Sequence, residues 1–285
     1  MKRIIIIFFI IFGIYLVFNS NLLSLLRFDK SSGDEVSLRG IDVIDIDISS
    51  VQATIIPENR KTLKTELSGK GKVTVDKSGD TLRVKYKQSG MNLFSFIKNN
   101  PKVTIYLPIN YENDMNIKVG SGLLNFSTLA KNSPIQLDYL DVKLGSGKMD
   151  LNNIRTKEFS FDGGSGVINI NRLITDDGSI DINSGIVKVE HYEGKLDASV
   201  LSGLLHVQID KLKDDIDIDV NSGQVKLDLP DDANFKLNSK LGSGLITCDF
   251  PLENRSQEKK KLTGVHGSGE HKLDISVSSG LVKIY

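Results

Sequence analysis

The chain has 285 residues, enough for one large domain or two small ones, and its 36 basic and 36 acidic residues give a formal net charge of zero. This balance argues against a nucleic-acid binder, because such a protein carries a basic excess on its binding face. Cys248 is the only cysteine, which excludes an intramolecular disulfide and a multi-thiolate zinc site.

The first residues are typical of a membrane segment. Two basic residues, Lys2 and Arg3, precede an apolar run that continues to Leu26. As a helix, this run spans roughly 34 Å, enough for a hydrocarbon core of about 30 Å. We therefore predict a transmembrane signal anchor over residues 1–26, with a cytoplasmic N-terminus and the rest of the chain outside the cell membrane. A cleaved signal peptide is the alternative, although the sequence fits an A-x-A-like cleavage site poorly.

Strand patterns dominate the rest of the chain. The polar, Gly/Ser-containing segment 27–40 is typical of a juxtamembrane linker. From Ile41 onward apolar and polar residues alternate with period two nearly everywhere, which predicts strands. The segment "SGMNLFSFIKNNP" (89–101) interrupts this pattern, and we expect a short helix or a packed loop there. Residues 41–285 are thus predicted to form one extracytoplasmic β-strand-repeat domain.

The most informative feature of this domain is an internal repeat centred on Ser-Gly. Successive copies are 18 to 25 residues apart, except for a last spacing of 36 that contains the charged insertion "ENRSQEKKK" (253–261). In every copy a serine directly precedes the glycine. The eight glycines are Gly122, Gly147, Gly166, Gly185, Gly203, Gly223, Gly244 and Gly280.

Each glycine is followed by the same apolar–polar pattern. The residues two and four places after it are apolar in all eight copies, and the residue between them is polar. This predicts strands with one face toward the core, so Cys248 is interpreted as a small core hydrophobe and His206 as a solvent-facing residue. The segment "IDIDISSVQATII" fits as a ninth copy, with Val51 in the glycine place and Ala53 and Ile55 pointing inward.

Two architectures fit such a repeat. In a β-solenoid each unit of about 20 residues makes one coil, and equivalent positions stack between coils. In an antiparallel meander each Ser-Gly is instead a tight hairpin turn. The even spacing and the identical serines favour stacking, because a coil corner must superpose on the next one. We therefore predict an all-β fold, a parallel β-helix-like solenoid of Ser-Gly coils preceded by one transmembrane helix, in which glycine is needed for a positive φ or because a Cβ has no room.

The recurring serine is interpreted as structural. A hydrolase nucleophile is a single residue beside a base, and the "GGSGV" segment around Ser165 lacks the G-x-S-x-G spacing. Stacked hydroxyls that hydrogen-bond to the backbone or to one another explain the repetition better. The histidines show no ligand-like clustering with cysteines or carboxylates. We predict no catalytic, cofactor-binding or metal-binding residues; the four histidines are His191, His206, His266 and His271.

At this point residues 41–285 resemble a known family, the DUF4097-type β-strand-repeat proteins that often carry an adhesin label. The resemblance rests on "VTIYLP" (103–108), on "MNIKVGSGLLNFS" (115–127) and on the recurring S-G-x-h-x-h units, where h is apolar. With its short N-terminal anchor, the chain looks most like the membrane-anchored members encoded in Lia-type envelope-stress operons of Gram-positive bacteria. The resemblance implies a solenoid-like extracytoplasmic domain and supplies no catalytic residues.

Two functions remain open from the sequence. The favoured one is a non-enzymatic envelope protein, an adhesin-like or stress-associated interaction scaffold tethered to the membrane, whose partner is an envelope protein or a cell-wall component. The alternative is a β-helix carbohydrate-active enzyme, which requires a groove with clustered carboxylates or basic residues. The acidic run "DDIDIDV" (214–220) is interpreted as a solvated strand face. No cofactor and no nucleic-acid partner are expected.

A solenoid needs a cap at each end, because its terminal coils expose unpaired backbone. At the N-terminal end, the strands of residues 61–87 and the 89–101 insertion are available as a cap. At the other end, we expect the C-terminal strand 281–285 to be the exposed edge. It is either shielded by residues 262–274 or paired with another chain, and shielding is favoured.

Overall fold

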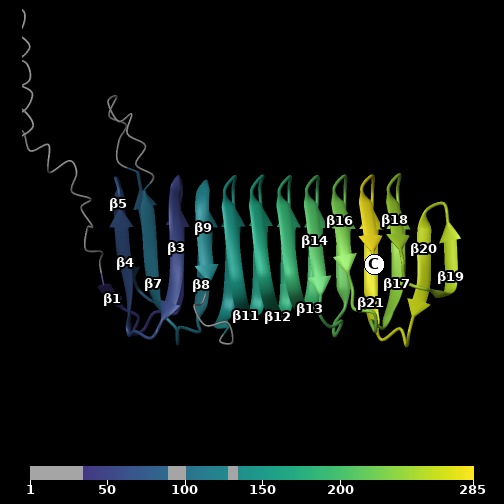
Figure 1. The fold of residues 1–285 in the computed structure, drawn as a ribbon, viewed down its shortest axis with the longest axis horizontal. Helices are drawn as coiled ribbons and strands as arrows, with labels where there is room; N and C mark the ends of the chain where they lie inside the picture. Colours follow the sequence, from purple (N-terminus) through teal and green to yellow (C-terminus); the bar gives the residue numbers. More distant parts are fainter. Residues whose placement is uncertain (1–34, 89–100, 128–133) are drawn as a thin grey trace, which may run out of the picture.

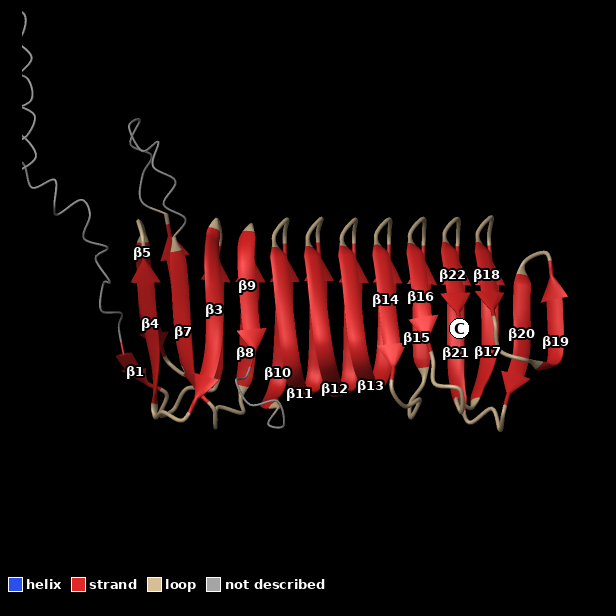
Figure 2. Cartoon of the chain, viewed as in Figure 1, coloured by secondary structure: helices blue, strands red, loops and turns tan. Residues whose placement is uncertain are grey.

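The computed structural model describes residues 35–88, 101–127 and 134–285, and within them every regular element is a β-strand. The strands lie next to one another along one long body and form two layers that face each other (Figures 1 and 2). Residues 1–34, which include the predicted anchor and most of the linker, and the insertion at 89–100 lie outside the described residues. No helix long and apolar enough to cross a membrane occurs in the described part of the chain.

Each coil rises through one layer, turns at a Ser-Gly corner and descends through the other. Layer I contains the strands that lead into the corners, and layer II contains those that leave them; the long strands β11, β12 and β13 bend and contribute to both. Layer I runs in the order β5 (Lys72–Ser78), β6 (Thr81–Lys87), β2 (Val43–Ile48), β8 (Asp114–Val119), β10 (Ile135–Leu144), β11 (Lys148–Gly163), β12 (Val167–Ile182), β13 (Ile186–Val200), β15 (Ile216–Val220), β21 (His271–Val277), β17 (Phe235–Leu241), β20 (Lys261–His266) and β19 (Glu253–Glu258). Layer II runs in the order β1 (Glu35–Ser37), β4 (Thr62–Ser68), β7 (Lys102–Pro108), β3 (Val51–Glu58), β9 (Gly122–Ser127), β11, β12, β13, β14 (Leu204–Ile209), β16 (Gln224–Asp228), β22 (Leu281–Ile284) and β18 (Leu245–Cys248).

The pairing between coils is parallel and in register, which confirms the solenoid and shows that the meander alternative is wrong. Met149 of β11 pairs with Ile168 of β12, and Ile168 pairs with Val187 of β13. The ninth copy is also confirmed, because Val51 pairs with Gly122 in the place of a corner glycine. The strands on either side of a corner therefore belong to opposite layers and do not pair with each other as a hairpin does.

The predicted inward positions form the core between the layers. All are buried except Cys248, which is half-buried because β18 is the outermost strand of layer II. Burying each such aliphatic side chain contributes roughly 1.5–3 kcal/mol, which offsets part of the backbone ordering. The buried positions are Leu124, Met149, Ile168, Val187, Leu205, Val225, Ile246, Val282, Phe126, Leu151, Ile170, Val189, Val207, Leu227 and Ile284.

The corner glycines are required by close stacking. A Cβ on Gly185 would lie 2.6 Å from the carbonyl oxygen of Gly166, and one on Gly203 would lie 2.5 Å from that of Gly185. Among these corner glycines, Gly122 alone has a positive φ, of 112°. Of the two predicted reasons for glycine, the lack of room for a Cβ therefore holds throughout the stack, and the positive φ holds at one copy.

The opposite ends of the central coils turn through residues in the left-handed conformation. Asn153, Arg172 and His191 have φ of 57°, 66° and 59°. The coil that contains His191 is one residue shorter than the coil before it, and the β12–β13 register shifts at this bend. There the Tyr192 hydroxyl donates a hydrogen bond to the carbonyl of Lys195 at 2.6 Å, which closes the shorter turn.

The two terminal coils are inserted one place in from the ends of the body. The C-terminal coil, β21 and β22, lies between the coil of β15 and β16 and the coil of β17 and β18 (the C in Figure 1). The prediction that residues 281–285 form an exposed edge is therefore wrong, because β22 has a parallel partner on both sides. The first coil, β2 and β3, is likewise held between the β6–β7 and β8–β9 pairs.

Antiparallel strands cover the body at its ends. At the N-terminal end β5 pairs antiparallel with β6, and β4 pairs antiparallel with β7. The predicted cap of residues 61–87 is therefore confirmed for β4 and β5, whereas β6 (81–87) pairs parallel with β2 and belongs to the stack. At the other end β20 pairs antiparallel with β17 and is itself covered by the exposed strand β19. Part of the predicted shielding segment 262–274 does shield an edge, but that edge is β17. In layer II, the structure gives β18 a partner only on its β22 side within the described residues.

We predict that the two corner residues differ sharply in importance. Gly185→Val should destabilise the fold by about 3 kcal/mol or more, because the added atoms clash with a backbone carbonyl that cannot move alone. Ser184→Ala should change stability by no more than about 0.5 kcal/mol, as expected for an exposed side chain. Urea unfolding followed by circular dichroism measures both, and equal effects would contradict the stacking.

Candidate functional site

The outer face of layer I displays two rows of polar side chains, four and six residues before each corner. The parallel register places equivalent residues of neighbouring coils side by side, about 4.8 Å apart. From β6 to β17, the upper row, nearer the corners, is Lys85, Asp47, Lys118, Lys143, Asp162, Asp181, Ser199, Asp219, Ser276 and Lys240. The lower row is Arg83, Asp45, Asn116, Asp141, Ser160, Ser179, Asp197, Asp217, Asp274 and Asn238.

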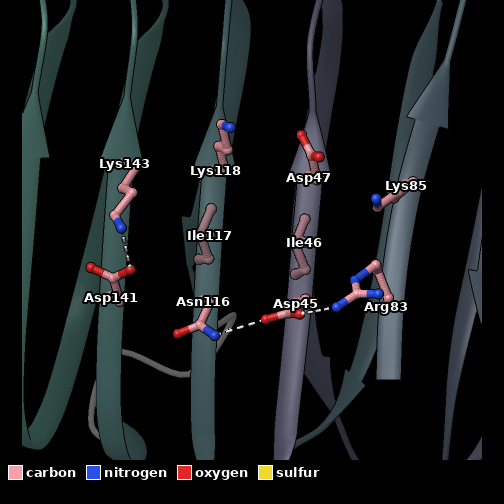
Figure 3. A pocket seen from close by; sticks show the side chains of 10 residues that line it. All are labelled: Asp45, Ile46, Asp47, Arg83, Lys85, Asn116, Ile117, Lys118, Asp141 and Lys143. Carbon is pink, nitrogen blue, oxygen red and sulfur yellow. Dashed lines mark hydrogen bonds and ion pairs between the residues drawn. The ribbon is translucent and has the colours of Figure 1, made fainter. Parts of the chain in front are cut away.

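A shallow pocket occupies the first four strands of this face (Figure 3). In its lower row Asp45 accepts a hydrogen bond from Asn116 at 2.7 Å and forms an ion pair with Arg83 at 3.2 Å. Lys143 lies 3.5 Å from Asp141. These contacts neutralise the lower carboxylates and leave Lys85 and Lys118 of the upper row available to an anionic or hydrogen-bonding ligand. We name the cations Arg83, Lys85, Lys118 and Lys143 together with Asp45, Asp47 and Asp141 the basic half of the face.

The next strands along carry an acidic half, consisting of Asp162, Asp181, Asp197, Asp217, Asp219 and Asp274. Three of these carboxylates, those of Asp197, Asp217 and Asp274, lie directly beside one another in register. Burial raises the pKa of the Asp217 carboxyl, and repulsion from Asp219, Asp197 and Asp274 raises it further. Lys240, at the far end of the upper row, only partly offsets this repulsion. The negative charge in these two rows is therefore largely uncompensated.

The corner serines form no catalytic arrangement in the described part of the chain. Seven of the eight are exposed. Ser121 lies 3.2 Å from the Ser49 hydroxyl and 3.1 Å from that of Ser50, which is the kind of serine–serine contact predicted from the sequence. Within the described residues no histidine hydrogen-bonds to these hydroxyls. The recurrence of the serine is therefore explained by the geometry of the corner.

The histidines lie apart from the corners, and no three His, Cys, Asp or Glu side chains are placed to hold a metal among the described residues. His191 Nδ1 lies 2.9 Å from Asp210 and His206 Nε2 lies 3.2 Å from the Tyr285 hydroxyl, both on the outside of the coils. The ring of His266 packs against Phe250 at the end of the core, 4.9 Å between centroids. Burial raises the pKa of the Cys248 thiol, which disfavours the reactive thiolate.

The two charged rows were not identified from the sequence. Reasoning from the residues after each glycine found the core, but the residues before it hold the charge pattern. Reading four places back from each corner gives Lys118 and Lys143 in the early coils, then Asp162 and Asp181. The separation of charge along the stack was therefore available in the alignment. The interpretation of residues 214–220 as a solvated face is consistent with the outward Asp217 and Asp219, but it overlooked their neighbours on other coils.

We predict that removing one charge from the acidic half stabilises the protein. Asp217→Asn should raise the unfolding free energy at pH 7 and low salt by about 0.2–1 kcal/mol, because like charges side by side on a sheet repel. Since the folded-state pKa of Asp217 is raised, its ionisation costs stability. The gain should therefore disappear as the pH falls through that raised pKa, and it should shrink in 0.5 M NaCl. Urea titrations at pH 7 and pH 3.5 test this with Ser179→Asn as the uncharged control; a destabilised Asp217→Asn at pH 7 would contradict it.

Comparisons with known proteins agree with the geometry. A search among curated proteins finds no match. Three solved structures, each described as a "putative adhesin", are similar to this chain. The protein from Bacteroides fragilis has 13% identity, a TM-score of 0.53 and coverage of 89% of this chain and 96% of its own. Those from Parabacteroides merdae (12% identity, TM-score 0.47, coverage 90% and 97%) and Parabacteroides distasonis (13% identity, TM-score 0.46, coverage 90% and 98%) are more distant. At these identities the likeness concerns the fold alone.

The narrower resemblance to the membrane-anchored members of Lia-type operons is not confirmed by these comparisons and stays a prediction. The family-level resemblance is confirmed. The model of the family described as Toastrack DUF4097 matches residues 41–285, which includes every Ser-Gly coil. This chain therefore belongs to the Toastrack DUF4097 family.

Proposed function

We propose that this protein is a non-enzymatic interaction scaffold on the outer side of a bacterial cell membrane, tethered by residues 1–26. Its repeat domain presents a surface to an envelope protein or a cell-wall component. On this proposal, activity lies in binding and in holding a partner at the membrane, and the predicted link to envelope stress in Gram-positive bacteria is part of the same hypothesis.

The observation that carries this proposal is the register of the coils. Parallel stacking at about 4.8 Å turns each outward position into a straight row of side chains. On layer I, two such rows extend from Lys85 and Arg83 on β6 to Lys240 and Asn238 on β17. A long, regular and charged surface of this kind suits an extended partner or a second flat face better than a small substrate.

The chemistry of the pocket in Figure 3 also supports binding rather than catalysis. Two of its three carboxylates are engaged by neighbouring groups, Asp45 by Arg83 and Asn116, and Asp141 by Lys143 (Figure 3). A glycosidase needs two carboxyl groups in different protonation states: a protonated one that acts as the acid, and an ionised one that acts as the base or nucleophile. The alternative of a carbohydrate-active enzyme therefore gains no specific support from this site.

Two further observations support the location. The apolar run that ends at Leu26 follows Lys2 and Arg3, a pattern that keeps the N-terminus in the cytoplasm. One solved structure with this fold carries a "putative adhesin" name, which refers to that protein and is consistent with a surface role here. The first observation concerns the N-terminal segment and the second concerns the fold, so the tether and the scaffold are tested separately.

We predict that protease added to intact, wall-stripped cells digests the repeat domain, and that the full chain stays in the membrane fraction after an alkaline wash. A chain that starts at residue 27 behind a cleavable signal should be exported but lost from the membrane. A cytoplasmic marker protein should stay intact in the same cells. A protected repeat domain, or a mature chain that begins after residue 20, would refute the tether.

A further inference from the structure

The outer face of layer I has its charges separated along the body. Toward the N-terminal end, Lys85 and Lys118 of the basic half have no ion-pair partner in the described residues, whereas Arg83 and Lys143 are paired with aspartates. Lys72 and Lys87, opposite each other on β5 and β6, continue the positive charge toward the end of the body. The basic half therefore has a small positive excess concentrated in its upper row.

The acidic half carries the opposite charge, and its negative excess is larger than the positive excess of the basic half. Among the described residues, only the carboxylate of Asp274 in this half accepts a side-chain hydrogen bond, from the Asn238 amide at 2.9 Å. Because the amide is neutral, this contact does not compensate the negative charge. The row below is compensated within the chain, because Lys195 lies 3.0 Å from Asp177 and Lys272 lies 3.9 Å from Asp215. The uncompensated negative charge is thus confined to the two rows that also carry the basic half.

The boundary between the halves lies at one pair of neighbouring strands. Lys143 of β10 is in register with Asp162 of β11. A two-fold axis that lies in the contact plane at this boundary, parallel to the strands, would lay the layer I face of one copy on that of another with their long axes antiparallel. It would then place β8 and β6 of one copy over β12 and β15 of the other, so that lysines face aspartates at both ends of the contact.

We propose that two copies of this chain associate face to face through layer I, in this antiparallel arrangement. The partner that fits a surface of separated charges is one with the same separation in reverse, and a second copy turned by a two-fold axis provides it. Because the contact is made by exposed charges, it is strong at low ionic strength and weakens with salt, since the screening length is about 8 Å at 0.15 M. The proposal concerns self-association and does not depend on the membrane tether.

The test uses the full chain, carried in two differently tagged forms that are mixed in a neutral detergent and purified through one tag. Wild-type chains should co-purify at 50 mM NaCl, and at least tenfold less should be recovered at 500 mM NaCl. The acidic-face variant Lys85→Glu, Lys118→Glu, Lys143→Glu should not associate with itself. The same should hold for the basic-face variant Asp162→Lys, Asp181→Lys, Asp219→Lys, which reverses the three aspartates that face Lys143, Lys118 and Lys85 in this arrangement.

The decisive arm mixes the two variants. The acidic-face and basic-face variants should co-purify with each other at 50 mM NaCl, because each supplies the charge that the other lacks. A matched control, Lys148→Glu, Lys188→Glu, Lys226→Glu, changes as many charges on the outer face of layer II and should associate like wild type. Far-ultraviolet circular dichroism confirms that each variant is folded.

Three results would overturn the proposal. The first is a wild-type chain that does not co-purify with itself at 50 mM NaCl. The second is a loss of association in the layer II control equal to that in the layer I variants. The third is a folded pair of complementary variants that fails to co-purify while wild type does, because this would place the contact elsewhere.

Discussion

The fold depends on the close stacking of glycines at the Ser-Gly corners. Along the stack, a Cβ added to a corner glycine would clash with the carbonyl oxygen of the preceding corner. The distance from this Cβ to that oxygen would be 2.6 Å at Gly166, Gly185 and Gly223. The backbone hydrogen bonds continue through the corner, as from Ser165 N–H to the Gly145 carbonyl at 2.8 Å. Since neighbouring corners touch backbone to backbone, the coils cannot slip against each other by one residue, and this fixes the inward and outward face of every strand.

The insertion of both terminal coils follows from the same stacking. Gly280 stacks on the carbonyl of Gly223, and Gly244 stacks on the carbonyl of Gly280, whose oxygen would lie 2.7 Å from a Cβ on Gly244. The last coil of the sequence is therefore the second-to-last coil of the stack. Antiparallel strands then lie outermost at three edges of the body: β5 and β19 at the two ends of layer I, and β1 at the N-terminal end of layer II. Edge strands of this kind interrupt the parallel stack and protect it from uncontrolled pairing with other chains.

Most of the coil was predictable from the sequence because its signal is local. The alternation after each glycine, repeated with serine in front, is enough to assign the core positions such as Ile168 and Val187, and the parallel register follows from their equal spacing. The spatial order of the coils was not predictable in this way. The spacing of 36 before Gly280 is typical of a missed copy with an insertion, whereas the insertion is the β19–β20 hairpin, after which the chain returns to a place between two other coils. Which coil accepts the last one depends on contacts far apart in sequence, and no local pattern contains them.

The candidate site was missed for a related reason. A charged surface on a stacked fold is a property of neighbouring coils, so Asp217 alone is an ordinary solvated residue, while Asp217 beside Asp197 and Asp274 is part of an acidic surface. The same geometry that packs the core aligns these side chains, and function in such a protein is therefore expected to lie in rows rather than in a single pocket. The proposed binding surface is consistent with the regular rows that the repeat produces.

The most direct test of the stacking is the order of the last three coils. In a Cys248→Ala background, Lys226→Cys with Lys283→Cys should form a disulfide on mild oxidation, because these residues are in register on neighbouring strands about 4.8 Å apart. Lys283→Cys with Thr247→Cys should do the same. Lys226→Cys with Thr247→Cys should not, because β22 separates them. Rapid crosslinking of this third pair, with none of the first, would show that the C-terminal coil is not inserted and would contradict the stacking order.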